Sequence, residues 1–411
     1  MSRPRLSAIA LVLSLATTAT TSAAAQDYRF DGPVRRDVLE DYLARSITFL
    51  DLLTEKGNFE DNLRMLKSTG AKFVGRSVYR WGGEADLPRI LALAAKNAPR
   101  VHAMDKDIVL QACLFEIVSP QVGELAVPAW VFEAFDMPVE ERCFDYEAML
   151  YPAGKLHGLW GGIGSVPDIS RQETKLWFYF LARSYIVSGI EALHFGQAEF
   201  MNENRQSPDD WGEVLDRVRE YAADHARRHW VLCDAHVPSG GLLRGNQLLF
   251  DFHSFPLRIK EVPDRPREGI LEVGFTDAIY GRSRGGIAPS GWRCDHLPYL
   301  VEIDNWGVSD RPGQPGVGGC WVWGYDEMSW FAHQPKEYRN QWLRYAWKWV
   351  REHDPAGYLQ MPGSRIVHAP VNGKHWYFAN TPSDAVPDGG GQEETIRQIW
   401  EEYAKSQTAK H

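Results

Sequence analysis

Short apolar runs of strand length alternate with amphipathic segments along most of the chain. We expect strands at the apolar runs, which fall at 72–78, 107–115, 142–150, 189–197, 229–236, 247–253, 297–304 and 319–325. Helical periodicity covers 34–68, 86–97, 128–135, 168–188, 208–228, 335–353 and 393–407. This alternating order is typical of a parallel sheet covered by helices.

Eight such strands predict an α/β fold of the (β/α)8 TIM-barrel type. Two connections, at 237–246 and 305–318, are rich in Gly and Pro, so we expect loops there in place of helices. Because the chain shows no linker, charge block or internal repeat, we expect one catalytic barrel domain over 26–411 with long βα loops. A doubly wound or mixed α/β sheet is the alternative.

The N-terminus has the three-part layout of a secretory signal peptide. Arg3 and Arg5 precede an apolar run at 6–15, and small residues follow up to Ala25. The run is shorter than the roughly 20 residues that span a bilayer. We therefore expect cleavage near Ala25 and a soluble protein that is secreted or periplasmic, without a membrane partner.

Charge and cysteine usage narrow the function classes. Removal of 1–25 leaves 43 basic against 54 acidic residues, a net charge of −11, which argues against nucleic acid as a partner. The five cysteines form no CxxC pair, so the fold does not depend on disulfides. If a bridge forms, Cys294 with Cys320 is the first pair to test.

Polar residues recur where the predicted strands end, which is where barrel enzymes carry their chemistry. Side chains alternate along a strand, so Asp234 can share a face with His236, and Asp251 with His253. Charged groups in apolar strands are costly unless they are paired or hydrated, so such a ring predicts a wet pocket. The candidates that contact substrate are Arg80, Glu116, Gln197, Asp234, His236, Asp251, His253, Asp304, Trp306, Trp323 and Glu327.

Aromatic residues favour a sugar ligand. The chain has 16 Trp, and several lie near predicted strand ends or in Gly-rich loops, where their faces can stack on pyranose rings. These are Trp81, Trp160, Trp292, Trp306, Trp323 and Trp330. The Gly-rich stretch at 160–164 lacks the Lys-Ser or Lys-Thr of a phosphate loop.

The pattern resembles the clan of retaining (β/α)8-barrel glycoside hydrolases with an acid/base after strand four and a nucleophile at the end of strand seven. The resemblance implies Glu199 as acid/base and Glu302 as nucleophile, with substrate contacts from His253 and Trp323. It also implies a basic residue on the first strand, at Arg76 or Arg80. Ala198 stands where the clan usually has Asn.

The chemistry of acetal cleavage points the same way. One carboxyl group must donate a proton to the leaving oxygen while another stays ionised and attacks the anomeric carbon or activates water. A separation of about 5–5.5 Å between the two groups predicts retention, and about 6.5–9.5 Å predicts inversion. Asp304 shares a face with Glu302, so either could be the second carboxylate, and an inverting enzyme would favour Asp304 or Asp234 as base.

Two other readings stay open. The two Asp-x-His pairs, at 234–236 and 251–253, could hold a divalent metal in a metal-dependent barrel hydrolase or isomerase. No His-x-His, His-Glu-x-x-His or Cys/His cluster accompanies them, so our main expectation includes no metal and no cofactor. The third reading is a barrel that binds carbohydrate without cleaving it. A Gly-x-Ser-x-Gly elbow for a serine hydrolase is absent.

Overall fold

Eight parallel strands close into a barrel in the computed structural model, which describes residues 26–203 and 208–408. The predicted signal segment 1–25 lies outside the described residues. The barrel strands are β1 (Ser46–Phe49), β2 (Phe73–Val78), β3 (Val109–Cys113), β4 (Ala192–His194), β5 (Leu232–Ala235), β8 (Phe252–Pro256), β13 (Tyr299–Glu302) and β14 (Gly357–Val371).

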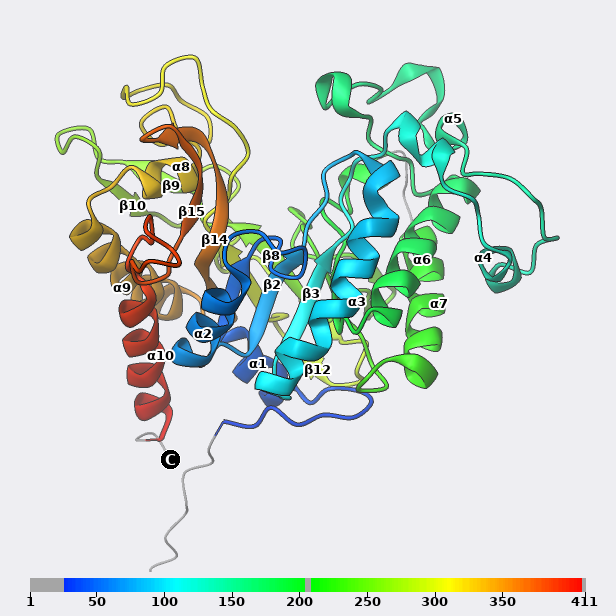
Figure 1. The fold of residues 1–411 in the computed structure, drawn as a ribbon, viewed down its shortest axis with the longest axis horizontal. Coiled ribbons are helices and arrows are strands. Elements are labelled where there is room, and N and C mark those ends of the chain that lie inside the picture. Colours follow the sequence, from blue (N-terminus) through cyan, green and yellow to red (C-terminus); the bar gives the residue numbers. More distant parts are fainter. Residues whose placement is uncertain (1–25, 204–207, 409–411) are drawn as a thin grey trace, which may run out of the picture.

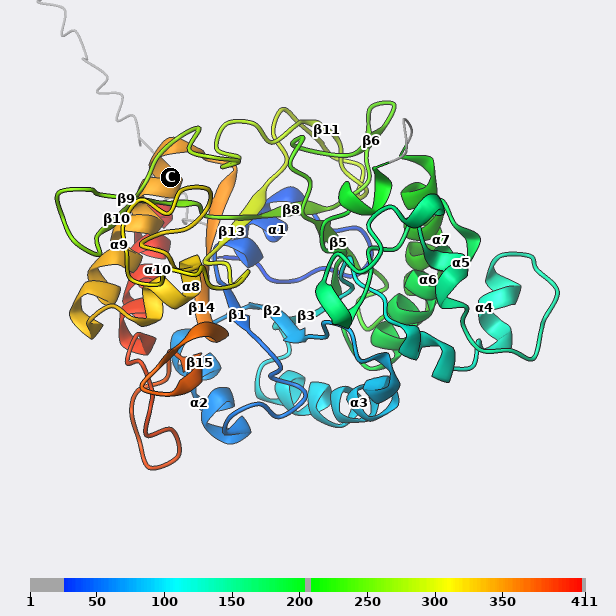
Figure 2. The same cartoon turned by 90° about the horizontal axis from the view of Figure 1, so that it is seen from above.

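The first and last barrel strands pair with each other, and this pairing closes the sheet. Ile47 of β1 is in register with Val74 of β2 on one side and with Met361 of β14 on the other. Figure 2 looks onto the ring of strands. A ninth strand, β15 (Lys374–Phe378), adds antiparallel to the far end of β14. The predicted (β/α)8 barrel is therefore confirmed.

Helices lie around the strands, with α9 and α10 on one side of the barrel in Figure 1 and α3, α6 and α7 on the other. Their bounds are α1 (Arg36–Leu43), α2 (Phe59–Thr69), α3 (Leu87–Met104), α4 (Ala129–Ala134), α5 (Tyr146–Met149), α6 (Gln172–Val187), α7 (Asp209–His225), α8 (Glu327–Ala332), α9 (Lys336–His353) and α10 (Glu393–Thr408). Local chemistry sets several ends. Asn58 caps α2 by accepting from Asp61 N, and Asp326 caps α8 by accepting from Ser329 N.

The long loops after β5 and β8 form small sheets of their own. One sheet contains β6 (Leu243–Arg244), β7 (Gln247–Leu248), β11 (Gly286–Ile287) and β12 (Arg293–Cys294), and the other pairs β9 (Ile259–Glu261) with β10 (Gly269–Leu271). The expected connections at 237–246 and 305–318 contain no helix.

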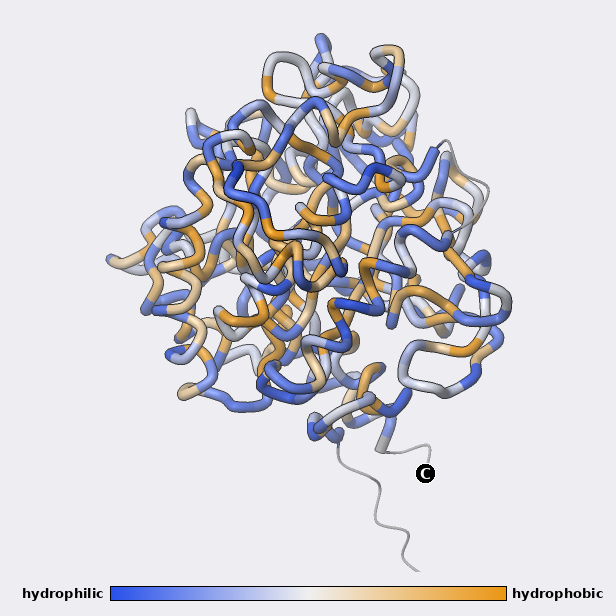
Figure 3. The backbone as a smooth tube through the Cα atoms, turned by 90° about the vertical axis from the view of Figure 1, so that its right-hand side faces the viewer, coloured by the Kyte–Doolittle hydropathy of each residue, from blue (hydrophilic) through white to orange (hydrophobic). Residues whose placement is uncertain are grey.

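Apolar side chains fill the barrel and the layer between strands and helices. Trp211, Trp330 and Trp400 are fully buried, and one hydrophobic cluster runs from Val34 to Trp400. Figure 3 shows hydrophobic stretches running through the interior, while hydrophilic ones are frequent along the outer loops. Burial of this kind is the main contribution to stability.

Two predicted strands are wrong. The segment 142–150 holds α5 and two isolated bridges, because Asp145 caps a short helix there by accepting from Ala148 N. The segment 319–325 forms a turn in which Val322 bridges Tyr325 and Gly324 has φ 72°. Neither segment belongs to the barrel.

Two barrel strands were not predicted. β1 lies inside the segment 34–68, which we had assigned to a single helix and which contains α1, β1 and α2. β14 was missed because Pro362 and Gly363 interrupt its apolar pattern. The missed strand β1 and the wrongly predicted strand at 142–150 cancel in the count, so β4 and β13 are still the fourth and seventh barrel strands.

The five cysteines are all free thiols, so the suggested Cys294–Cys320 bridge is not formed. Cys294 is buried in a small apolar cluster with Leu248 and Leu297, and its thiol lies against the carbonyl of Gly286. None of the helices in the described ranges has the length and apolar character that crossing a membrane requires.

Candidate functional site

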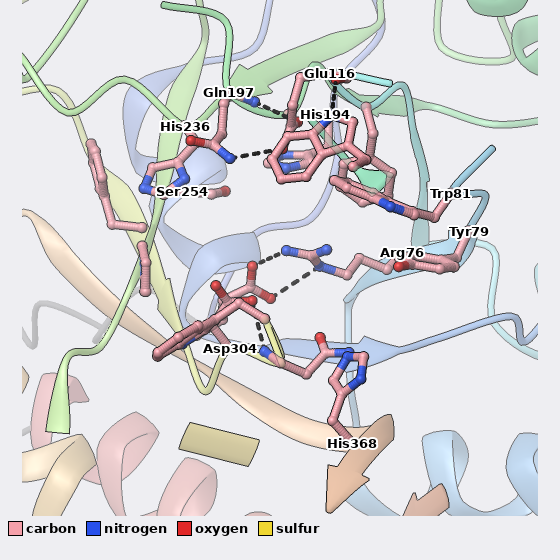
Figure 4. A pocket seen from close by; sticks show the side chains of 18 residues that line it. Arg76, Tyr79, Trp81, Glu116, His194, Gln197, His236, Ser254, Asp304 and His368 are labelled. Atoms are coloured by element: carbon pink, nitrogen blue, oxygen red, sulfur yellow. Dashed lines mark hydrogen bonds and ion pairs between the residues drawn. The ribbon is translucent and has the colours of Figure 1, made fainter. Parts of the chain in front are cut away.

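A pocket of about 420 Å³ opens at the carboxyl ends of the barrel strands. Figure 4 shows Glu116 and Gln197 at its upper edge, Asp304 and His368 at its lower edge, and Arg76 between them. The residues that line it are Arg76, Tyr79, Trp81, Phe115, Glu116, Trp160, His194, Gly196, Gln197, His236, Ser254, Phe255, Pro256, Glu302, Asp304, Asn305, Trp306 and His368.

Two arginines hold Glu302, the last residue of β13. Arg76 of β2 binds both carboxylate oxygens of Glu302, with Nε 3.1 Å from Oε2 and Nη2 on Oε1. Arg365 of β14 donates from Nη1 to Oε2 at 2.7 Å. The side chain of Arg365 is only 1% exposed, so this ion pair is largely shielded from solvent.

These cations keep Glu302 ionised. Burial by itself would raise the pKa of Glu302, but the charges of Arg76 and Arg365 outweigh burial and lower the pKa to about 2. The backbone of Arg76 has φ 55° at a register shift between Val74 and Val78 of β2. This left-handed conformation is strained for an arginine, and strain of this kind is typical of functional sites.

A buried carboxylate, Glu327, fixes the loops that follow β8 and β13. Its Oε1 accepts from Arg258 N at 2.6 Å and its Oε2 from Asp304 N at 2.9 Å. Burial raises the pKa of Glu327 to about 7, although the charge of Arg258 opposes this. Glu327 lies outside the pocket lining and positions the backbone of Asp304 from there. Oδ1 of Asp304 lies 3.5 Å from Nη2 of Arg365.

Glu116 lies three residues beyond the end of β3 and is held by Gln197, which follows Gly196. Gln197 donates to Glu116 twice, from its backbone N at 2.9 Å and from Nε2 at 2.8 Å. Gly196 has φ 50°, and a Cβ at this position would lie 2.2 Å from Oε2 of Glu116. Only glycine therefore lets the Glu116 carboxylate lie against the backbone after β4.

His194, the last residue of β4, is backed by a buried carboxylate. Its Nδ1 lies 2.7 Å from Oδ2 of Asp234, which is fully buried. Asp234 also accepts from Gln111 Nε2 and from Ser254 Oγ, each at 2.6 Å. Because a carboxylate only accepts, Nδ1 of His194 carries a proton and donates it to Asp234.

Aromatic rings form one wall of the pocket. Trp81 packs edge-to-face on Phe115 and on Trp160, with ring centroids 5.4 and 5.0 Å apart. Trp306 is 37% exposed and lies 3.9 Å from Trp321, centroid to centroid. Such surfaces suit the apolar face of a sugar ring.

The structure brings six of the predicted catalytic and substrate-contacting residues into this pocket. They are Glu116, Gln197, His236, Glu302, Asp304 and Trp306, and Arg76 joins them. Burial lowers the pKa of His236 to about 4, so its ring is neutral near pH 7. Asp234 lies behind the pocket wall, in contact with His194.

Glu199 and Arg80 lie outside the lining of this pocket. The Glu199 carboxylate accepts from the backbone N of Ser239 at 3.1 Å and from the Ser239 hydroxyl. Arg80 donates to the carbonyl of Gly82 at 2.6 Å and borders two neighbouring hollows. The role predicted for Glu199 stays a prediction.

The remaining candidates serve contacts inside the fold. Asp251 accepts from Arg219 and from Cys233 N, and His253 is fully buried. Trp323 is 4% exposed and donates to the carbonyl of Glu268. Asp251, His253, Trp323 and Glu327 therefore do not line the pocket.

Several residues that line the pocket or support it from behind were missed in the sequence. Arg365 and His368 lie on β14, which was not predicted, and Ser254 follows the end of the predicted sixth strand. His194 was inside a predicted strand that we extended to Gln197. Its position beside Asp234 arises from pairing between β4 and β5, which the spacing of residues does not show.

The metal reading gains no support from the arrangement. Within the described parts of the chain, no group of three or more His, Cys, Asp or Glu side chains could hold a metal ion. Of the two Asp-x-His pairs, only His236 reaches the pocket.

No protein-family model matches the chain, and no curated protein matches its sequence. Distant similarity to solved structures is found. A debranching enzyme from Nostoc punctiforme in its native form has a TM-score of 0.32 and 10% identity, covering 55% of this chain and 53% of that one. A beta-galactosidase from Bacillus circulans sp. alkalophilus has a TM-score of 0.39 and 10% identity, covering 87% and 55%.

A third similar structure is endo-glycoceramidase II from Rhodococcus sp. in a cellobiose-like imidazole complex. It has a TM-score of 0.36 and 12% identity, covering 86% of this chain and 78% of that one. The chain spans about half the length of the first two proteins. Identities of 10–12% and TM-scores below 0.4 do not assign the chain to a family.

Proposed function

We propose that this barrel is a glycoside hydrolase that cleaves glycosidic bonds in a poly- or oligosaccharide. The observation that carries the proposal is Glu302, an ionised carboxylate held at the pocket wall by Arg76 and Arg365. It faces a pocket with aromatic walls, a second carboxylate and several neutral hydrogen-bonding groups. Acetal cleavage needs one ionised carboxylate and one proton donor in a single pocket.

In this proposal Glu302 attacks the anomeric carbon, and Glu116 protonates the leaving oxygen as the glycosidic bond breaks. A water molecule then gives a proton to Glu116 while its oxygen attacks the anomeric carbon and the bond to Glu302 breaks, so the anomeric configuration is retained. Glu116 takes the proton-donor role here because it lines the pocket, whereas Glu199 hydrogen-bonds Ser239 outside it. Export to the periplasm or medium belongs to the same proposal and rests on 1–25.

A panel of polysaccharides and nitrophenyl glycosides, with product sizing and anomer-resolved NMR, tests the activity. We expect Glu302→Gln to lower kcat/KM by about a thousandfold or more, because the attacking group is lost. Glu116→Gln should cost more than Glu199→Gln. The reverse order would return proton transfer to Glu199, and full activity of Glu302→Gln would refute the mechanism.

A barrel that binds sugar without cleaving it is the second candidate. It is favoured because both carboxylates already accept hydrogen bonds from the protein. Gln197 donates twice to Glu116, and two arginines donate to Glu302. Binding of a glycan by the wild-type protein, with no product after prolonged incubation, would establish this function instead.

A further inference from the structure

A second hollow adjoins the pocket, between the loops that follow β1 and β2. It has a volume of about 410 Å³, close to that of the pocket, and Tyr79 and Trp81 line both spaces. Figure 4 shows these two side chains together, beside Arg76. The loop after β1 contributes Asp51 and Thr54 to the second hollow. A ligand that fills the pocket can therefore extend past Trp81 into this space.

Hydrogen bonds hold the two loops of the second hollow together. Asp51 N donates to the carbonyl of Arg76 at 3.1 Å, and Leu53 N donates to the carbonyl of Ser77 at 2.9 Å. The Asp51 carboxylate accepts from Tyr79 N at 3.1 Å. A site whose backbone is already held in place loses less conformational entropy when a ligand binds.

Three consecutive residues after β2 carry polar groups that have no partner in the protein. Within residues 26–203 and 208–408, no hydrogen bond is formed by the hydroxyl of Tyr79, by Nη1 of Arg80 or by the indole N–H of Trp81. None of these three atoms is fully shielded from solvent. By contrast, Trp160 and Trp323 donate their indole N–H groups to carbonyls. The three groups after β2 are therefore available to a ligand.

Arg80 borders the second hollow but not the pocket. Its Nη2 donates to the carbonyl of Gly82 at 2.6 Å, which orients the guanidinium group. In the part of the chain that the structure describes, Arg80 forms no ion pair, and its Nε is buried without a partner. A guanidinium group with unfilled donors at the edge of a hollow favours a ligand that offers oxygen acceptors.

The chemistry of the second hollow suits a sugar. Equal numbers of acidic and basic residues line it, so charge alone does not favour an ion of either sign. These residues are Asp51, Glu55, Asp86, Lys56, Arg80 and Arg89. The oxygens of a sugar can accept from Arg80 and Trp81 and can exchange hydrogen bonds with the Tyr79 hydroxyl, while the indole ring offers an apolar surface.

We propose that the second hollow is a further sugar-binding site, which takes another unit of the chain that is cleaved over Glu302. The substrate is then an oligosaccharide or polysaccharide that extends past Trp81, and Arg80 binds the extension. This inference rests on the proposed function, because the chain must lie in the pocket while its extension enters the second hollow.

The first test is the dependence of turnover on chain length. We would measure kcat/KM for cello-, manno- and galacto-oligosaccharides of two to six units. For the series that is cleaved, we expect kcat/KM to rise about tenfold once the chain is long enough to enter the second hollow, since one charged hydrogen bond contributes about this much. The same kcat/KM at every length would overturn the proposal.

Arg80→Met tests whether the gain with length arises at the second hollow. The variant removes the guanidinium donors, so we expect the ratio of kcat/KM between the six-unit and the two-unit substrate to fall about tenfold. Arg80→Lys, which keeps one charged donor, should restore part of the ratio.

Arg183→Met is the matched control for Arg80→Met. Arg183 of α6 also forms no ion pair in the described ranges, and it lies over the rings of Trp130 and Tyr221, away from both spaces. Its replacement should leave the ratio unchanged. An Arg80→Met or Arg80→Lys protein with a normal thermal transition and the wild-type ratio would overturn the role of the second hollow.

Calorimetry with the wild-type protein and the same oligosaccharides separates this proposal from the proposed function. If longer chains bind more tightly and are not cleaved, the hydrolase fails while the second sugar site stands. If all lengths are cleaved equally well, the second site fails while the hydrolase stands. If no oligosaccharide of the three series is bound or cleaved, the second sugar site is overturned.

Discussion

The two sides of the pocket hold their carboxylates by different means. On the charged side, formed by β2, β13 and β14, Glu302 lies between Arg76 and Arg365. On the amide side, formed by the ends of β3 and β4, the Glu116 carboxylate accepts, among the described residues, only from neutral N–H groups of Gln197. Permanent cations keep a carboxylate ionised over a wide pH range, whereas amides position it without adding charge. A proton donor is better placed on the amide side.

Gln111 of β3 connects the two sides. Its side-chain oxygen accepts from Arg76 N at 3.1 Å, and its Nε2 donates to Asp234 at 2.6 Å. The strained backbone of Arg76 and the buried carboxylate behind His194 are therefore coupled through one amide. Both sides depend on a rigid barrel interior.

The largest effect is expected at the charged side, from Arg365→Met. Loss of this buried guanidinium leaves Glu302 with Arg76 as its remaining cation, and breaking a buried pair costs about 3–5 kcal/mol of unfolding free energy. Urea denaturation at pH 7 measures the loss. Arg64→Met is the matched control, because Arg64 also binds two carboxylates, Asp61 and Glu393, but is 46% exposed.

We expect Arg64→Met to cost less than half as much, since solvent screens exposed pairs. Equal losses of unfolding free energy in the two variants would show that burial does not determine how much the ion pairs of Arg365 stabilise the protein.

The second prediction concerns Glu302 of the charged side and Glu327 of α8, whose pKa values are shifted in opposite directions. The pKa of Glu302 is lowered to about 2, so its contribution to stability is present above pH 4.5 and is lost as the pH falls toward 2. The pKa of Glu327 is raised to about 7, so its contribution is full below pH 4.5 and is lost as the pH rises through 7.

From Glu327 alone we expect the free energy of unfolding to fall by about 3 kcal/mol between pH 4.5 and 7.5. Denaturant titrations across this range, compared with Glu327→Gln, measure the difference, because glutamine does not titrate. A variant with the same slope as the wild type would contradict the buried, protonated form of Glu327.

The sequence predicted the barrel where apolar runs end in polar residues, as in β3, β4, β5 and β13. It did not reveal β1, whose four residues lie between two helices, or β14, where Pro362 and Gly363 break the pattern. The apolar and polar pattern along one strand does not show which residues of other strands will lie beside it. On the charged side the sequence therefore indicated Glu302, Asp304 and one of Arg76 and Arg80, but not Arg365.

The direction of the chain after β4 was also beyond sequence reasoning. Alternation along a straight strand places Gln197 and Glu199 on the same face, so both appeared able to reach the pocket. The left-handed backbone of Gly196 turns the chain after β4, and Gln197 then lies on Glu116 while Glu199 lies on Ser239. A single backbone angle decides which side chain faces the site.

Gly196→Ala tests this turn and is the smallest of the expected effects. The new Cβ would lie 2.2 Å from Oε2 of Glu116, so the carboxylate must move away from Gln197. We expect kcat/KM to fall about tenfold, since misplacing a proton donor by about 1 Å is costly. Backbone strain of alanine at φ 50° should by itself cost about 1 kcal/mol of stability, and displacement of Glu116 adds to this loss.

The control variant Gly373→Ala distinguishes the effect of backbone strain from the effect of displacing Glu116. Gly373 has φ 75° in the turn between β14 and β15, and a Cβ there meets nothing within 4 Å. Gly196→Ala should lose more stability than Gly373→Ala, because its Cβ also lies 3.1 Å from the backbone of Phe115 and Glu116. Only Gly196→Ala should lose activity and shift the pH dependence of kcat. Equal activity of the two variants would mean that the position of Glu116 against the β4 backbone does not matter to the reaction, and proton transfer would then have to be sought on the charged side.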